Sequence, residues 1–156
     1  CILSGWNNAS DAFHQTASSA NGEGACLAMT HALNKANITP EKISYINAHG
    51  TGTGNNDLSE SIAIKRVFDK NIPPFSSTKG FTGHTLAAAG AIEAVYCSQS
   101  IQAQSIFPNL NFSTPMTETG MVPETTFRPG VQVEYVLSNS FGFGGNCTSL
   151  IFGKVH

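Results

Sequence analysis

The sequence predicts an α/β domain in which helices pack on a mostly parallel sheet. Short apolar segments, typical of strands buried on both faces, alternate along the chain with longer segments of helical periodicity. Two further strand-like segments, joined by a glycine turn, follow in residues 131–154. This order of elements is typical of a layered α/β fold, and 156 residues suffice for one domain with a substantial core.

The first third of the chain predicts a strand, a helix and a second strand. Residues 1–6 are strand-like and lack a leading methionine, so we expect the chain to be cut from a longer protein. Residues 22–37 form an amphipathic helix, and Asn21 is placed to cap its start. The apolar residues 43–48 then form a strand buried on both faces.

A second helix follows the glycine-rich loop, in residues 57–70. Asp57 and Glu60 stand three positions apart, which is the spacing of a capping box at a helix start. We expect the apolar face of this helix to carry Leu58, Ile62, Val67 and Phe68.

The next predicted elements are a short strand in residues 74–78 and an alanine-rich helix in residues 79–102. Glu93 is the single charge in the helical part, so we expect this helix to be buried all round. A loop marked by three prolines leads from it to the final strand pair.

Composition argues against several function classes. Charged residues make up 12% of the chain against a usual share of about 25%, so we expect other protein to cover part of the surface. The net charge of −2 and the lack of a basic patch argue against nucleic-acid binding. Residues 86–95, the longest weakly polar stretch, are too few to span a bilayer. The four cysteines have neither zinc-ligand nor disulfide-framework spacing, which predicts reduced thiols, a cytoplasmic location and no metal.

Three loops carry the candidate site. Residues 47–54, 76–84 and 138–145 each follow a predicted strand and supply small residues, hydrogen-bond donors or a titratable side chain. Functional groups in α/β folds gather at the carboxyl ends of the strands, so we expect these loops to form one site. Thr51 and Thr53 offer hydroxyls to a polar, elongated ligand. Neither glycine-rich loop completes a phosphate-binding motif, which argues against nucleotide binding.

Each candidate residue also has a purely structural explanation. His49 by itself would be read as a core histidine, but His84 and Lys79 in the matching loop favour a site. An unpaired ammonium at Lys79 would be costly among small and apolar neighbours, and Glu93 is placed to compensate it. A structural ion pair of these two residues, without catalysis, stays open. Cys26 lies near a helix start but on the apolar face, so we interpret it as a buried hydrophobe, with a reactive nucleophile as the alternative.

Together, the three loops resemble motifs of the β-ketoacyl-acyl-carrier-protein synthases, the condensing enzymes of fatty-acid and polyketide synthesis. The resemblance is to the carboxyl-terminal half and extends to residues 10–14 and 21–29. It implies that residues 1–156 are the carboxyl-terminal domain of a thiolase-like fold with a layered, mostly parallel mixed sheet. It also implies an amino-terminal half that packs on this domain, a homodimer, and acyl carrier protein as partner, with substrates on its phosphopantetheine and no other cofactor.

The resemblance assigns catalytic roles residue by residue. His49 and His84 match the two active-site histidines, which would stabilise the enolate oxygen formed when malonyl carrier protein loses carbon dioxide. Lys79 matches a lysine whose positive charge would keep His84 neutral. Glu93 matches the acidic residue that supports this lysine.

The resemblance also assigns residues to binding. Thr51 and Thr53 match the threonines that bind the phosphopantetheine arm. Phe143 matches a gating phenylalanine whose backbone N–H would help to form the oxyanion hole, whereas Phe141 packs beside it. The chain departs from the family pattern in having Gly54 for a proline, and Asn146 and Cys147 after the glycine turn, which bears on hydrogen bonding there.

The implied activity is decarboxylative Claisen condensation of malonyl carrier protein with an acyl thioester. The family's nucleophilic cysteine lies in the amino-terminal half, so we expect residues 1–156 alone to be inactive and to expose the apolar face that meets that half. Two alternatives stay open. One is a non-catalytic partner subunit similar to a chain-length factor, and the other is a thiolase acting on coenzyme A esters, which Cys147 matches poorly.

Overall fold

The structure is a computed structural model that describes residues 1–155. Within this range a five-stranded sheet has the strand order β1-β7-β6-β2-β3. The strands are β1 (Ile2–Ser10), β2 (Ile43–Asn47), β3 (Phe75–Ser76), β6 (Tyr135–Gly142) and β7 (Asn146–Gly153). β2 is parallel to both β3 and β6, whereas β7 is antiparallel to β6 and to β1. The predicted mixed sheet is confirmed, and its parallel part is β3, β2 and β6.

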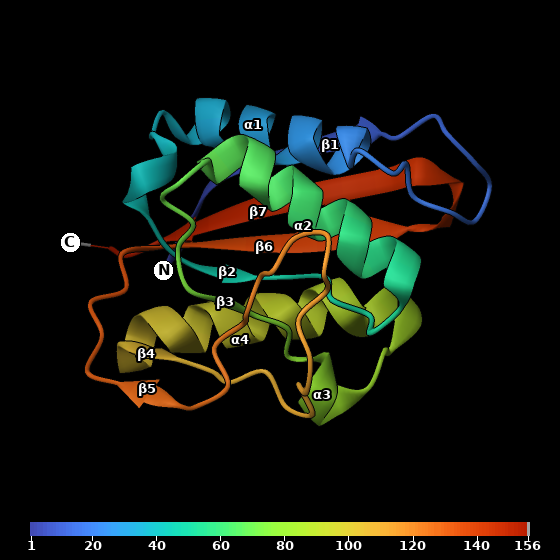
Figure 1. The fold of residues 1–156 in the computed structure, drawn as a ribbon. Helices are drawn as coiled ribbons and strands as arrows, with labels where there is room; N and C mark the ends of the chain where they lie inside the picture. Colours follow the sequence, from blue (N-terminus) through green and yellow to red (C-terminus); the bar gives the residue numbers. More distant parts are fainter. Residues whose placement is uncertain (156) are drawn as a thin grey trace.

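The three long helices of the described range lie on opposite faces of this sheet (Figure 1). α1 (Glu23–Ala36) and α2 (Gly54–Phe68) lie side by side on one face, and α4 (Ala89–Ala103) lies on the other. The shorter elements are η1 (Pro40–Lys42), α3 (Lys79–Thr82), β4 (Ser105–Ile106), η2 (Leu86–Ala88), β5 (Arg128–Pro129) and η3 (Phe143–Gly145). β4 and β5 pair as a separate two-stranded ladder.

Strand β2, which lies between β6 and β3, contributes to two cores. Ile46 is fully buried in the core under α1 and α2, and Tyr45 is fully buried in the core under α4. Successive side chains of a strand point to opposite faces of the sheet, so adjacent residues enter different cores. This confirms the prediction of a strand that is buried on both faces.

The predicted alanine-rich helix over residues 79–102 is broken, which corrects the sequence expectation. α3 ends at Gly83, whose φ of 70° is left-handed, and α4 does not begin until Ala89. Nor is α4 buried all round: its buried side chains form one stripe, whereas Val95 is 56% exposed. One face of α4 packs on the sheet, and Ala91, Val95 and Gln99 on the opposite face are exposed.

The predicted cap of α1 is also wrong. Gly22, and not Asn21, is the N-cap residue, and it caps without a side-chain hydrogen bond. The first N–H groups of the helix are bonded by the preceding loop: Ser19 Oγ accepts from Glu23 N at 3.1 Å, and Asp11 Oδ1 accepts from Gly24 N at 2.9 Å. Asp11 is too far away in sequence for a local pattern to reveal it as a cap.

α2 differs from its prediction in start and orientation. It begins at Gly54, so Asp57 and Glu60 do not form a capping box at its N-terminus. The buried face carries Ser59, Glu60, Ala63, Ile64 and Phe68, and of the four predicted apolar positions the last alone is fully on it. Small residues allow close packing here, since a Cβ at Gly22 of the α1 start would lie 2.3 Å from the Ser59 carbonyl oxygen.

Candidate active site

The parallel strands bring the three predicted loops together at one edge of the sheet. His49 follows β2 and is buried, and His84 lies exposed in the break between α3 and η2. Their ring centroids are 5.4 Å apart, and the rings meet edge to face at 87°. Two histidines separated by 35 positions are therefore neighbours because β2 and β3 pair in parallel and end together.

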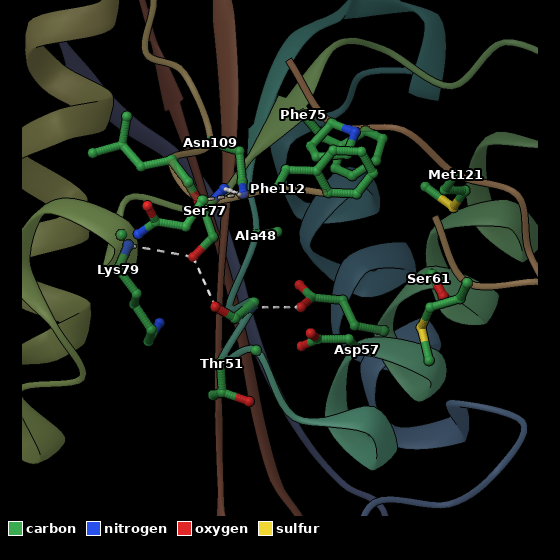
Figure 2. Close-up of a pocket in the computed structure, with 18 of the residues that line it drawn as sticks. Ala48, Thr51, Asp57, Ser61, Phe75, Ser77, Lys79, Asn109, Phe112 and Met121 are labelled. Atoms are coloured by element: carbon green, nitrogen blue, oxygen red, sulfur yellow. Dashed lines mark hydrogen bonds between the residues drawn. The ribbon is translucent and has the colours of Figure 1, made fainter. Parts of the chain in front are cut away.

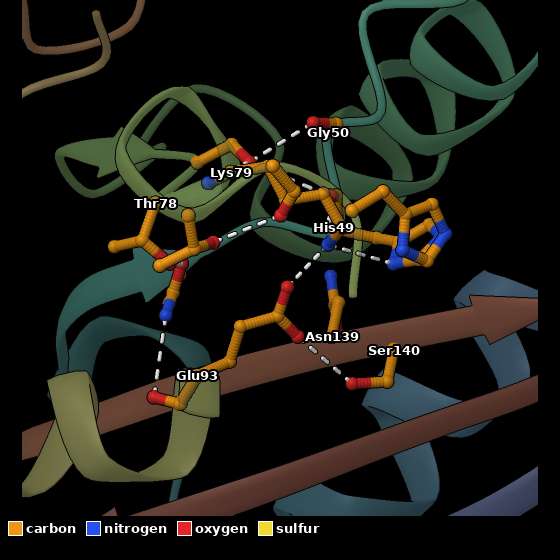
Figure 3. Close-up of polar contacts among 12 residues, drawn as sticks. His49, Gly50, Thr78, Lys79, Glu93, Asn139 and Ser140 are labelled. Carbon is orange, nitrogen blue, oxygen red and sulfur yellow. Dashed lines mark hydrogen bonds and ion pairs between the residues drawn. The ribbon is translucent and has the colours of Figure 1, made fainter. Parts of the chain in front are cut away.

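A buried ion pair lies beside His49 (Figure 3). Lys79 Nζ pairs with one carboxylate oxygen of Glu93, and the other oxygen accepts a hydrogen bond from Ser140 at 3.1 Å. The same ammonium donates to the carbonyl oxygen of His49 at 2.5 Å and lies 3.2 Å from its Nδ1. The lysine is 9% exposed and the glutamate 2%, so the predicted compensation of a buried ammonium by Glu93 is present.

The surroundings of His49 keep its imidazole neutral. Burial lowers the pKa of His49 to about 3, and the charges of Lys79 and His84 act in the same direction. The ammonium can only donate, so Nδ1 of the neutral ring is the acceptor and the proton resides on Nε2. We expected Lys79 to act on His84, but the structure places its ammonium against His49.

His84 has the same tautomer in its neutral form. Its Nδ1 accepts from the backbone N–H of Leu86 at 3.2 Å, which leaves the ring proton on Nε2. Both rings therefore offer an Nε2–H donor from adjacent positions. Such a pair of donors can stabilise negative charge that develops on a single oxygen atom.

Glu60 is a site residue that sequence reasoning missed. Its carboxylate is 3% exposed and accepts from the backbone N–H groups of His49 and Gly50, both at 2.9 Å. It also accepts from Asn139 Nδ2 at 3.1 Å, and burial raises the pKa of Glu60. A signal was present in the sequence, because this charged residue shares helical spacing with Ala63 and Ile64 on the buried face of α2.

A cavity of about 520 Å³ opens beside the cluster (Figure 2). Thr51, Lys79 and His84 are among its lining residues, and Phe75 and Phe112 lie at the end away from Thr51. Thr51 and Thr53 share a hydrogen bond between their hydroxyls at 2.8 Å, but the second threonine is not among the lining residues found in 1–155. The two predicted arm-binding residues are thus adjacent but face different surroundings.

The glycine turn places its two phenylalanines differently. Phe143 is 77% exposed, whereas Phe141 is partly buried, with its ring centroid 5.6 Å from that of His49. The expected packing role of Phe141 is confirmed, and the gating role of Phe143 stays a prediction. The turn is tied to the loop before α1, because Gly144 N donates to the carbonyl oxygen of Gln15 at 2.7 Å.

The cysteines show no sign of a nucleophile. All four are free thiols, and Cys26 is partly buried against the core, as expected of a hydrophobe. Cys147 is buried under α1, and burial raises the pKa of its thiol to about 12. No helix of residues 1–155 is long and apolar enough to cross a membrane, and the same residues contain no cluster of three or more potential metal ligands.

Comparisons with known sequences agree with this geometry. The family described as beta-ketoacyl synthase, C-terminal domain, matches residues 1–113. The chain is 40% identical over 158 residues to 3-oxoacyl-[acyl-carrier-protein] synthase 2 of Vibrio harveyi, covering 98% of this chain and 38% of that protein. It is 39% identical over 152 residues to the protein of the same name from Staphylococcus aureus (strain COL), covering 96% and 37%.

Solved structures share the fold over nearly the whole chain. A type II polyketide synthase acyl-carrier protein in complex with its ketosynthase bound to the hexaketide matches with a TM-score of 0.94 and 33% identity, covering 99% of this chain and 38% of that one. A ketosynthase in complex with its chain length factor from Xenorhabdus doucetiae matches with a TM-score of 0.84 and 43% identity, covering 98% and 39%. The chain therefore spans less than half the length of the proteins it matches.

The layered mixed sheet, with a histidine pair at the ends of its parallel strands, is a thiolase-like fold of the ketosynthase type. The chain belongs to the β-ketoacyl synthase family and corresponds to the carboxyl-terminal domain of its members.

Proposed function

We propose that the whole protein catalyses decarboxylative Claisen condensation of malonyl carrier protein with an acyl thioester. The observation that carries this proposal is the edge-to-face pair of His49 and His84, both in the tautomer that offers Nε2–H. Burial, assisted by the charge of Lys79, keeps the first of these rings neutral by lowering the pKa of His49, and the neutral ring acts as a hydrogen-bond donor. Two Nε2–H donors side by side suit an enolate, whose charge appears on one oxygen.

The chemistry divides between this chain and the rest of the protein. A cysteine outside the chain first takes up the acyl group as a thioester. The malonyl C–C bond then breaks, carbon dioxide leaves, and the electron pair forms an enolate whose oxygen accepts from His49 and His84. The enolate carbon attacks the acyl thioester carbonyl, the new C–C bond forms, and the cysteine leaves as thiolate.

The partners we propose follow from the surface and from the relatives. Acyl carrier protein would deliver the malonyl group on its phosphopantetheine arm, with Thr51 and Thr53 as contacts and Phe143 as gate, and no further cofactor would be needed. One solved relative is a complex of this kind. We also propose that residues 1–156 are one domain, covered by an amino-terminal half, in a cytoplasmic homodimer.

A non-catalytic partner subunit is the second candidate, because two related structures contain a chain length factor. The clustering of His49, His84 and Lys79 in one site favours the enzyme, since a partner that does not react has no need of them. A thiolase is disfavoured, because the buried Cys147 with a pKa raised to about 12 is a poor acid/base at neutral pH.

The test is carbon dioxide release from malonyl-loaded carrier protein by the full-length protein, its His84→Ala variant and the isolated 156-residue chain. We expect release by the full-length protein, a loss of about 100-fold or more in the variant, and none from the chain. His31→Ala, at an exposed position on α1, is the matched control and should retain the rate. A folded full-length protein that released nothing would favour the partner subunit instead.

A further inference from the structure

A segment outside the three site loops is bonded to β3, one of the two edge strands of the sheet. Residues 107–124, here called the strap, connect to β3 at both of their ends. Glu124 N donates to the carbonyl oxygen of Phe75 at 2.8 Å. Ser76 Oγ donates to the carbonyl oxygen of Phe107 at 2.7 Å. The strap is therefore fixed to the strand that leads into the site.

Asn109 connects the strap to Ser77, the first residue after β3 (Figure 2). Its backbone N–H donates to the carbonyl oxygen of Glu124 at 2.6 Å, which closes the strap. Its side-chain Oδ1 accepts from Ser77 N at 2.9 Å, and its Nδ2 donates to the next carbonyl along the chain at 3.2 Å. Ser77 is 7% exposed, so its N–H would be costly to leave unpaired.

The hydroxyl of Ser77 joins the two loops that meet at the buried ion pair. Ser77 Oγ donates to the carbonyl oxygen of Gly50 at 2.9 Å and accepts from Lys79 N at 3.4 Å. The first of these partners directly follows His49, and the second carries the ammonium that lies 3.2 Å from His49 Nδ1. The approach of this ammonium to the imidazole therefore depends on where Ser77 is held.

We propose that Asn109 is a positioning residue of the condensation site. Through the N–H of Ser77 it fixes the Ser77 hydroxyl, and this hydroxyl sets the approach of Lys79 to His49. This inference rests on the proposed function. Leucine has nearly the shape of asparagine but no acceptor, whereas aspartate keeps an oxygen at the place of Oδ1. The two substitutions at this position therefore separate the hydrogen bond from the shape of the side chain.

The experiment compares Asn109→Leu and Asn109→Asp in the full-length protein, with malonyl decarboxylation and acylation of the nucleophile measured separately. We expect the kcat of decarboxylation by Asn109→Leu to fall by about 10-fold, because a small misplacement of catalytic groups slows the step that uses them. The KM for malonyl carrier protein should stay within about 2-fold and the acylation rate within about 3-fold. Asn109→Asp should keep the decarboxylation rate within about 3-fold, because its oxygen still accepts from Ser77 N.

Ser77→Ala tests the route by which Asn109 acts. This variant should itself lower the kcat of decarboxylation by about 10-fold, because it removes the hydroxyl between the two loops. Adding Asn109→Leu should then cause no further loss, since both substitutions remove the same contact. A further loss of about 10-fold in the double variant would contradict the inference.

Thr117→Ala is the matched control within the strap. Its hydroxyl bonds the adjacent Glu118 at an exposed position, so the variant should retain the decarboxylation rate. The inference fails if Asn109→Leu decarboxylates like wild type, if both half-reactions fall equally, or if Asn109→Asp is as slow as Asn109→Leu. Should Asn109→Leu not fold, Asn109→Ala replaces it in the same comparisons, with the same expected loss. Wild-type decarboxylation by His49→Ala would overturn the proposed function, whatever Asn109 does.

Discussion

At the scale of single residues, charge placement defines this site. Lys79 and Glu93 are both buried, and removing one partner of such a pair leaves the other charge uncompensated. The attraction between the two charges is offset by the free energy that both ions lose when they leave water, so the pair is a weak source of stability. Its local effect is to hold a cation 3.2 Å from His49 Nδ1, which selects the tautomer of that ring and adds to the effect of burial in lowering its pKa.

The shifted titration of His49 predicts a pH dependence of stability. Its pKa in the folded protein is about 3, against an ordinary value of 6.5 in the unfolded chain. Below pH 6.5 the unfolded state binds more protons, so the stability from neutral His49 is complete above that pH and is lost as pH falls toward 3. As the pH falls from 6 to 4, we expect the free energy of unfolding to decrease by about 1.4 kcal/mol per pH unit because of His49.

Urea unfolding of the full-length protein and of His49→Gln over this pH range measures the effect. In His49→Gln, the free energy of unfolding should fall less steeply with decreasing pH, because the variant has no imidazole at this position to protonate when the chain unfolds. Equal slopes in the two proteins would show that His49 titrates alike in both states.

At the scale of elements, the break between α3 and α4 shapes the site. In a continuous helix over residues 79–102, Lys79 and His84 would have had fixed positions on the same helix. Instead Gly83 ends α3 in a left-handed conformation, so the lysine enters the interior while the histidine stays in a loop beside His49. The start of α4 could not be predicted from the sequence, because the alanine-rich segment shows no clear difference between a polar and an apolar face.

The start of α1 provides a test at this scale. Asp11 accepts from Ser19 N at 2.5 Å, from Ser19 Oγ at 2.6 Å and from Gly24 N at 2.9 Å, so one side chain orders both the loop and the first helical turn. We expect Asp11→Ala to lower the free energy of unfolding by about 2 kcal/mol. Asn21→Ala, at the position that local sequence favours as a cap, should change it by less than about 0.5 kcal/mol.

Urea unfolding of both variants decides between the two caps. An equal effect of the two substitutions, or a larger one for Asn21→Ala, would contradict the hydrogen bonds of Asp11.

At the scale of the whole molecule, the outer face of α4 is unusual for a free surface. Val95 is 56% exposed and Leu86, in the preceding turn, is 77% exposed, in a chain with only 12% charged residues. Exposed apolar surface of this kind marks an interaction site. Nearly the whole chain matches a relative, but the match spans only 38% of that relative's length. We therefore expect the remainder of the full-length protein to cover the outer face of α4.

The isolated chain should therefore self-associate, because water contact with this face is unfavourable. Light scattering should show oligomers, and Val95→Lys should raise the monomer fraction. Val122→Lys is the matched control, since this valine is 59% exposed but lies in a loop outside α4. A stable monomer of the unmodified chain would count against a covered α4 face.

Part of the fold could be predicted from the sequence. The apolar run of residues 43–48 predicted the buried strand β2, and the glycine turn predicted the pairing of β6 and β7, because both are local patterns of polarity and backbone freedom. His49 and His84 were identified as a pair by the matching positions of their loops after strands. The start of α1 was predicted poorly, since Asp11, which bonds its first turn, is distant in sequence. The start of α2 was also missed, and its N-cap residue Thr53 makes no side-chain capping hydrogen bond.

Local patterns along the chain thus determined the order of strands and helices, the three loops at the ends of strands and the residue types available for chemistry. Tertiary structure decided how those residues act: that Lys79 lies on His49, that Glu60 binds a loop instead of capping a helix, and that Asp11 caps α1. The reason is physical. Periodicity depends on the nearest few residues, whereas burial, hydrogen-bond partners and pKa values depend on groups that meet only when the sheet and its helices pack.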